Sequence, residues 1–188
     1  MIFRWIGAHV SGVGWLVRRI TEHTLRPMNP HFSTIASERE LRLTRIIDAP
    51  RERVFSAWTQ RLPEWWGPHG MTTPVCEMDL RPGGVFRTVM RAPDGTEYPT
   101  RGIFAEVVPN ERIVFTDAFD AGWIPHPAAF FTAIVTFEAL PGGRSRYTAR
   151  ALHWTAENCE RHEKMGFHQG WGESLDRLVN CVMRVAAA

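Results

Sequence analysis

The chain has 188 residues, of which 44% are hydrophobic and 22% charged, a composition typical of one globular domain with a core large enough to fold alone. The formal net charge of +2 lies within residues 1–40, which hold five arginines against three glutamates. The rest of the chain is therefore neutral, and a neutral body without a basic stripe argues against nucleic acid as a partner. The cysteines are odd in number and form no CxxC pair, which favours buried thiols in a cytoplasmic protein over a disulfide framework.

Residues 1–36 differ from the rest of the sequence. A largely apolar run from Trp5 to Val17 is bracketed by Arg4 and the pair Arg18-Arg19. The run is shorter than the roughly 20 residues that span a bilayer, and the two arginines stand where a signal peptide would carry small residues. We expect a poorly ordered or short helical leader without membrane contact, followed by one domain over residues 37–188.

The domain is expected to begin with a strand, LRLTRIID, and two short helices. Pro50 suits the start of the first helix, because its missing N–H would have no partner there, and PRERVFSAW continues with helical spacing of apolar residues. The second helix, LPEWW, ends at Gly67-Pro68. The pair Trp65-Trp66 either plugs the core or lines the entrance of a cavity, and Trp66 is the better cavity candidate because it directly precedes Gly-Pro.

Six further apolar segments follow, separated by breaks that mostly combine Pro with Gly or Asn. The segments are TPVCEMDL, VFRTVMR, RGIFAEVV, RIVFTDAF, FFTAIVTFEAL and RSRYTARALHW. Breaks of this kind form tight hairpins between antiparallel strands. Together with the first strand, the pattern predicts about seven strands.

Residues 155–184 are predicted to form one long helix with Thr155 as its N-cap. One apolar stripe recurs at steps of three and four residues: His168, Trp171, Leu175, Leu178 and Val182. The helix also contains Gly166, Gly170 and Gly172, each of which disfavours it by about 1 kcal/mol, so we expect close contact with another surface there. The element order predicts an α+β fold in which a curved antiparallel sheet wraps around this helix and encloses an elongated cavity.

With these elements in place, the sequence resembles the START-like (SRPBCC) superfamily of helix-grip domains. Within it, the sequence is similar to the family named after the activator of heat-shock-protein-90 ATPase. The resemblance covers residues 41–184 and rests on segments such as IDAPRERVFSAWT, WWGPHGMTTPVCEMDLRPGG and HEKMGFHQGWGESLDRL. It implies the helix-grip fold. It is compatible with a ligand-binding domain, with an enzyme of the cyclase or hydrolase kind and with a co-chaperone-like interaction domain, because one fold serves many functions.

The alternation of side chains along the strands predicts the face that lines the cavity. In VFRTVMR, the arginines fall on one side, which should face solvent, and the phenylalanine and methionine on the other. Adding the inner residues of the following strands and of the helix gives the predicted ligand-binding set: Trp66, Phe86, Met90, Phe104, Phe115, Met165, His168 and Trp171. A wall with so few polar groups suits a hydrophobic or aromatic small molecule.

The sequence patterns indicate no metal, cofactor or catalytic centre. HExxH, a phosphate-binding loop and the GxSxG elbow are absent, and Cys159 with His162 has no two further zinc ligands nearby in the sequence. His168 is interpreted as a core histidine or as a polar group inside the cavity. Because no acid–base pair is evident, we expect binding of a hydrophobic small molecule without catalysis; the enzyme and the interaction domain are the alternatives. No oligomeric state is favoured.

Overall fold

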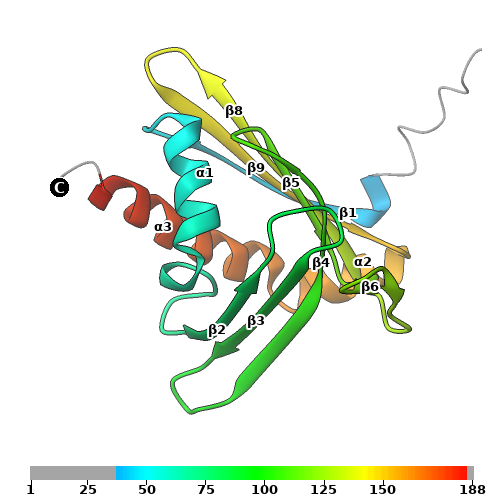
Figure 1. Ribbon diagram of the computed structural model, residues 1–188. Helices are drawn as coiled ribbons and strands as arrows, with labels where there is room; N and C mark the ends of the chain where they lie inside the picture. The colour runs from blue at the N-terminus through cyan, green and yellow to red at the C-terminus, as the bar shows by residue number, and fades with distance from the viewer. Residues whose placement is uncertain (1–36, 186–188) are drawn as a thin grey trace, which may run out of the picture. The chain divides into compact units, whose positions relative to one another are not determined.

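The computed structural model describes residues 37–185 (Figure 1), so the leader predicted over residues 1–36 lies outside the described residues. The elements in chain order are η2 (Ser37–Arg39), β1 (Glu40–Ile47), α1 (Arg51–Gln60), η3 (Leu62–Glu64), β2 (Thr72–Met78), β3 (Val85–Arg91), β4 (Glu97–Val108), β5 (Arg112–Thr116), β6 (Phe119–Asp120), β7 (Ile124–Pro125), β8 (Phe131–Leu140), β9 (Arg144–His153), α2 (Ala156–Lys164) and α3 (Phe167–Val185). The predicted strand, two short helices, six strands and C-terminal helical segment therefore all occur, in the predicted order.

Seven strands form one antiparallel sheet in the order β1-β9-β8-β5-β4-β3-β2, and β6 pairs with β7 in a separate small hairpin. The sheet is strongly curved, with β2 and β3 crossing the direction of β8 and β9 (Figure 1). Helices α1 and α3 contact each other and lie on the same side of the sheet (Figure 1). The arrangement is the predicted α+β helix-grip fold.

The long helix predicted over residues 155–184 is interrupted, and that prediction is wrong. Thr155 is the N-cap of α2, as expected, and its hydroxyl accepts a hydrogen bond from the backbone N–H of Asn158 at 3.1 Å. However, α2 ends at Lys164, because Gly166 adopts a φ of 91°, which a side-chain-bearing residue rarely adopts. The backbone N–H of Gly166 donates to the carbonyl of Glu163 at 2.9 Å, which closes the end of the helix.

This break changes which residues face inward at the start of α3. Phe167 is 2% exposed and takes the inner position that the uninterrupted helix would have given to His168. The His168 side chain is 55% exposed and lies 4.0 Å from Glu163. From Trp171 onward the predicted stripe is kept, because Leu175, Leu178 and Val182 are all buried.

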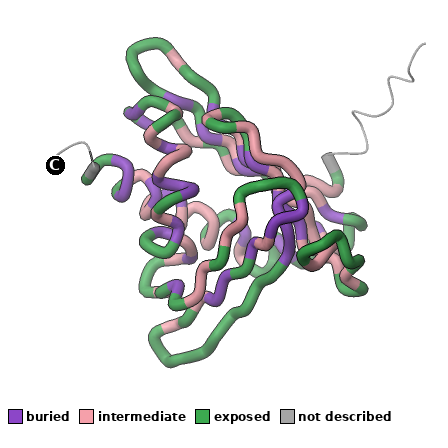
Figure 2. The backbone as a smooth tube through the Cα atoms, in the orientation of Figure 1, coloured by how far each residue is buried: buried purple, intermediate pink, exposed green. Residues whose placement is uncertain are grey.

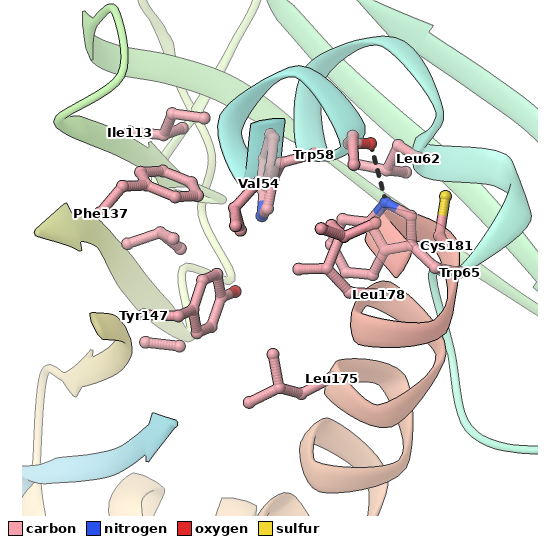
Figure 3. Packing of buried hydrophobic residues seen from close by; sticks show 14 of the residues in the cluster. Val54, Trp58, Leu62, Trp65, Ile113, Phe137, Tyr147, Leu175, Leu178 and Cys181 are labelled. Atoms are coloured by element: carbon pink, nitrogen blue, oxygen red, sulfur yellow. Dashed lines mark hydrogen bonds between the residues drawn. The ribbon is translucent and has the colours of Figure 1, made fainter. Parts of the chain in front are cut away.

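The core lies between the inner face of the sheet and the two helices α1 and α3, where the buried parts of the chain gather (Figure 2). Trp58 of α1 is fully buried at its centre. Its ring lies 6.0–6.4 Å from five other aromatic rings, those of Trp65, Trp66, Phe86, Phe104 and Phe115. Figure 3 shows Trp58 beside Val54 and Leu62, with Leu178 and Cys181 of α3 approaching from the other helix. This aromatic cluster anchors α1 and η3 on the sheet.

Candidate functional site

A cavity of about 900 Å³ lies between the sheet and α3. Its wall is mainly aromatic and aliphatic, and it includes residues from β3, β4, β5, β8, β9, α2 and α3 as well as from the loop after η3. The exposed side chains on its wall include Tyr98 and Met165, which are 46% and 71% exposed. The cavity therefore reaches solvent between the start of β4 and the α2–α3 junction. Its volume falls within the range found for small-molecule sites.

Six of the eight residues predicted from the sequence line this cavity. They come from the loop after η3, from β3 and β5, from the α2–α3 junction and from α3: Trp66, Phe86, Met90, Phe115, Met165 and Trp171. Side-chain alternation along β3 and β5 therefore selected residues that the fold brings together.

Phe104 and His168 lie elsewhere. Phe104 is 0% exposed and packs within the core, with its ring 5.0 Å from that of Phe86 and 6.4 Å from that of Trp58. Trp58 and Phe86 thus separate Phe104 from the cavity. His168 lies on the exposed side of α3 because the break at Gly166 turns it outward.

The two adjacent tryptophans have different environments. Trp65 also borders the cavity, but it is 2% exposed and its indole N–H donates to the carbonyl of Ala57 at 3.1 Å (Figure 3), so it mainly plugs the core. Trp66 is half-buried and lines the cavity, and its indole N–H has no hydrogen-bond partner in the described part of the chain. Gly67 follows with a φ of 98°, and a Cβ there would approach the Sδ of Met90 to 3.0 Å. A glycine at this position lets the loop lie against the cavity wall.

Arg177 of α3 fixes this loop. Its guanidinium donates to the backbone carbonyls of Gly67, Pro68 and Met71 at 2.9, 3.0 and 3.1 Å, and to that of Glu64 at 3.2 Å. Burial lowers the pKa of Arg177, and no carboxylate pairs with it among the described residues. This role is not predictable from the sequence, since an arginine on a helix ordinarily indicates a solvated face. The contact holds one wall of the cavity in place without a salt bridge.

A histidine pair lies at the other end of the site. His153 ends β9 and His162 belongs to α2, and they are 5% and 8% exposed. The Nε2 of His153 lies 2.9 Å from the Nδ1 of His162, and the Nδ1 of His153 lies 3.2 Å from the backbone carbonyl oxygen of Arg39. His162 also lines the cavity, where its ring contacts those of Phe130, Phe131, Phe167 and Trp171 at 5.1–6.0 Å.

Burial disfavours a charge on either ring of the pair. Burial, reinforced by the neighbouring His153, lowers the pKa of His162 from 6.5 to about 4. Burial also lowers the pKa of His153. Both rings are therefore neutral at pH 7. Sequence reasoning considered His162 only as a zinc ligand beside Cys159, because its true partner lies across the turn between β9 and α2.

No group of three or more His, Cys, Asp or Glu side chains within residues 37–185 could hold a metal ion. The three cysteines are free thiols, and burial is the main reason why their pKa values are raised. None of the helices in this part of the chain is long and apolar enough to cross a membrane.

A curved antiparallel sheet that grips a C-terminal helix around an apolar cavity defines a helix-grip domain of the START-like class. Comparison with protein families identifies the group: the model of the "Activator of Hsp90 ATPase homolog 1-like protein" family matches residues 48–183, and the chain belongs to this family.

Solved structures agree with this assignment. A protein from Nitrosomonas europaea is 34% identical with a TM-score of 0.76, covering 81% of this chain and 99% of its own. A protein from Chromobacterium violaceum is 26% identical with a TM-score of 0.62, covering 75% and 95%. A protein of the same family from Silicibacter pomeroyi is 27% identical with a TM-score of 0.58, also covering 75% and 95%. A search of curated proteins finds no match.

Proposed function

We propose that this domain binds a hydrophobic small molecule in the cavity and does not transform it. The observation that carries the proposal is the cavity itself: about 900 Å³, walled mainly by aromatic and aliphatic side chains, and reached from solvent beside Tyr98 and Met165. An apolar molecule that enters it gains roughly 25 cal/mol for each Å² of surface removed from water. This gain has to exceed the cost of association, so a well-filling ligand is favoured over a small one.

The polar groups on the wall support binding without catalysis. The carboxylate of Asp117 already accepts the backbone N–H groups of Phe130 and Phe131 at 2.9–3.1 Å. The carboxylate of Glu97 is paired with Arg91 at 2.7 Å. Among the described residues that line the cavity, no carboxylate is hydrogen-bonded to a histidine, which is the usual arrangement for general acid–base chemistry.

The test uses a neutral hydrophobic dye, N-phenylnaphthylamine, whose fluorescence rises in apolar surroundings. Ala149 of β9 lines the cavity, so Ala149→Leu places three more carbons inside it and should weaken dye binding several-fold. Because the cavity accepts those carbons, the variant should not show the ~1–3 kcal/mol loss typical of an overpacked core. Urea unfolding measures that difference.

The matched control is Thr148→Leu, one residue away on the opposite face of β9. Thr148 contacts Thr44 across the outer surface, with 3.2 Å between the two hydroxyl oxygens. This variant should bind the dye like the wild type. Equal dye affinity in the wild type and Ala149→Leu would show that the dye binds outside the cavity. The proposal would then give way to a role of the outer surface in interaction with another protein.

A further inference from the structure

The hydrogen bonds of the histidine pair determine where its protons lie. A backbone carbonyl can only accept, so the Nδ1 of His153, 3.2 Å from the carbonyl oxygen of Arg39, carries a proton. Because His153 is neutral, its Nε2 is an acceptor, and the Nδ1 of His162 at 2.9 Å must donate to it. The hydrogen bonds therefore run in one direction: His162 donates to His153, and His153 donates to the carbonyl of Arg39.

The first residue of this hydrogen-bond chain, His162, belongs to the cavity wall. With its proton on Nδ1, a neutral His162 keeps an unprotonated Nε2 that can only accept a hydrogen bond. This nitrogen has no partner within the described residues, and although the residue is only 8% exposed, the nitrogen is not among the buried side-chain atoms that lack a partner. The rings around it are apolar, and its nearest aromatic neighbours include Phe130, Phe131 and Trp171. A ligand that displaces solvent from this nitrogen has to supply a donor, because an acceptor that becomes buried without a partner is costly.

The charges around this end argue against an ionic ligand. An anion would bring a second acceptor to Nε2 of His162 and would approach the carboxylate of Asp117, which also lines the cavity. An ammonium group would need a free carboxylate, but the Asp117 oxygens are already hydrogen-bonded to two backbone N–H groups. The guanidinium of Arg161 lies over the ring of Phe130, 4.5 Å from its centroid, and its positive charge would repel a cationic ligand nearby. A neutral donor such as a hydroxyl group meets none of these costs.

We infer that the ligand of the cavity is a neutral hydrophobic molecule with a hydroxyl group, which donates a hydrogen bond to Nε2 of His162 while its apolar body extends along the aromatic wall. The inference rests on the proposed binding function and narrows its ligand class. His162 is the recognition residue. His153 is a positioning residue, because it fixes the side of the His162 ring that carries the proton.

The experiment measures displacement of N-phenylnaphthylamine from the full chain by five probes that differ in one group. The probes are para-butylphenol, para-butyltoluene, para-butylanisole, para-butylbenzoate and para-butylbenzylammonium. The phenol should bind about 2- to 10-fold more tightly than the toluene, the gain of one net hydrogen bond. The anisole, which can only accept, and both ions should bind more weakly than the phenol.

Two variants separate recognition from positioning. In His162→Phe the acceptor is lost, so the phenol should become at least about fivefold weaker than the toluene, because its hydroxyl is buried without a partner. In His153→Phe the Nδ1 of His162 loses its acceptor and the ring can carry its proton on either nitrogen. The preference for phenol over anisole should then shrink, while the affinity for the toluene stays the same.

A ligand-free measurement tests the proton positions directly. Long-range ¹H–¹⁵N correlation spectra of the wild type at pH 7 should show a protonated Nδ1 and an unprotonated Nε2 for His162. The inference is overturned by the opposite tautomer, by tighter binding of the ammonium or benzoate than of the phenol, or by a selectivity that His162→Phe leaves unchanged. In those cases binding of the dye and the toluene would still uphold the proposed function. If neither the dye nor any probe binds, the proposed function fails, and the inference fails with it.

Discussion

The buried histidine pair should make the stability of the domain depend on pH. The pKa of His162 is about 4 in the folded state, against an ordinary value of 6.5 that applies to the unfolded chain. Between these values the unfolded state binds a proton that the folded state does not, so the free energy of unfolding falls as the pH is lowered. Each pKa unit is worth about 1.4 kcal/mol, so stability should drop by about 2 kcal/mol between pH 7.5 and 5, and by roughly 3 kcal/mol by pH 4.

The assay is urea unfolding of the wild type and of His162→Phe at pH 7.5, 6.5, 5.5 and 5. This range avoids the carboxylates whose pKa values hydrogen bonds lower in the fold, such as Glu40 with Arg150 and Arg42, because they lose their contribution only as the pH falls below about 4.5. The wild type should therefore show the loss of about 2 kcal/mol, and His162→Phe should show a clearly smaller loss that comes from His153. As a control, His168→Gln changes an exposed histidine and should follow the wild type.

A wild-type stability that stays constant from pH 7.5 to 5 would refute the reasoning. So would an equal loss in His162→Phe, since the proton uptake would then belong to another group. His153 adds a contribution of the same sign, because burial lowers its pKa too. The two rings share one hydrogen bond, so their contributions are not additive and His153→Phe should also flatten the profile.

Two further predictions concern the cavity loop and the helix break, and urea unfolding checks both. Arg177→Met should lower the free energy of unfolding by about 2–4 kcal/mol, because it leaves the carbonyls of the loop after η3 without their donor. The variant should also bind the dye more weakly. Unchanged stability would mean that water replaces the guanidinium without loss. Gly170→Ala should stabilise α3 by up to about 1 kcal/mol, because alanine favours a helix and its Cβ would lie at an ordinary contact distance of 3.5 Å from Pro68. Gly166→Ala should instead destabilise the protein by about 1–2 kcal/mol, because the backbone φ at this position is positive. Equal effects of the two alanines would contradict the assigned backbone conformations.

Most of the fold could be predicted because its signals are local. Alternating apolar residues and short breaks with Pro, Gly or Asn reveal each long strand, and both depend only on neighbouring residues. The break between α2 and α3 was missed although its signal was present: Lys164 and Gly166 form the usual ending of a helix, a basic residue before a glycine. The apolar stripe that continues on both sides of Gly166 concealed it. Because the prediction did not include this break of two residues, it placed His168 on the inner face of the helix instead of the exposed face.

The site was only partly predictable because alternation gives the face of a strand and not the depth of a residue below it. Phe86, Phe104 and Phe115 all point to the inner side of the sheet, but only the tertiary position of Trp58 decides that Phe104 is sealed in the core. The histidine pair depends on contacts between β9 and α2 that no periodicity describes. Arg177 likewise acts through carbonyls more than a hundred positions away in sequence.

The unpartnered polar atoms near the cavity differ in whether a bound molecule can reach them. Within the described residues, four buried side-chain atoms lack a hydrogen-bond partner: Trp58 Nε1, Trp66 Nε1, His126 Nδ1 and Ser145 Oγ. Three of these four belong to residues that line the cavity, but solvent does not reach the unpartnered atoms themselves. A ligand in the cavity therefore cannot pair with these atoms unless the wall rearranges, so they do not indicate which molecule binds. The Nε2 of His162 differs from them, because it also lacks a partner but is not one of the atoms sealed from solvent. It is thus the unpartnered atom of the wall that a bound molecule can pair with without a change in packing, which is consistent with His162 as the recognition residue.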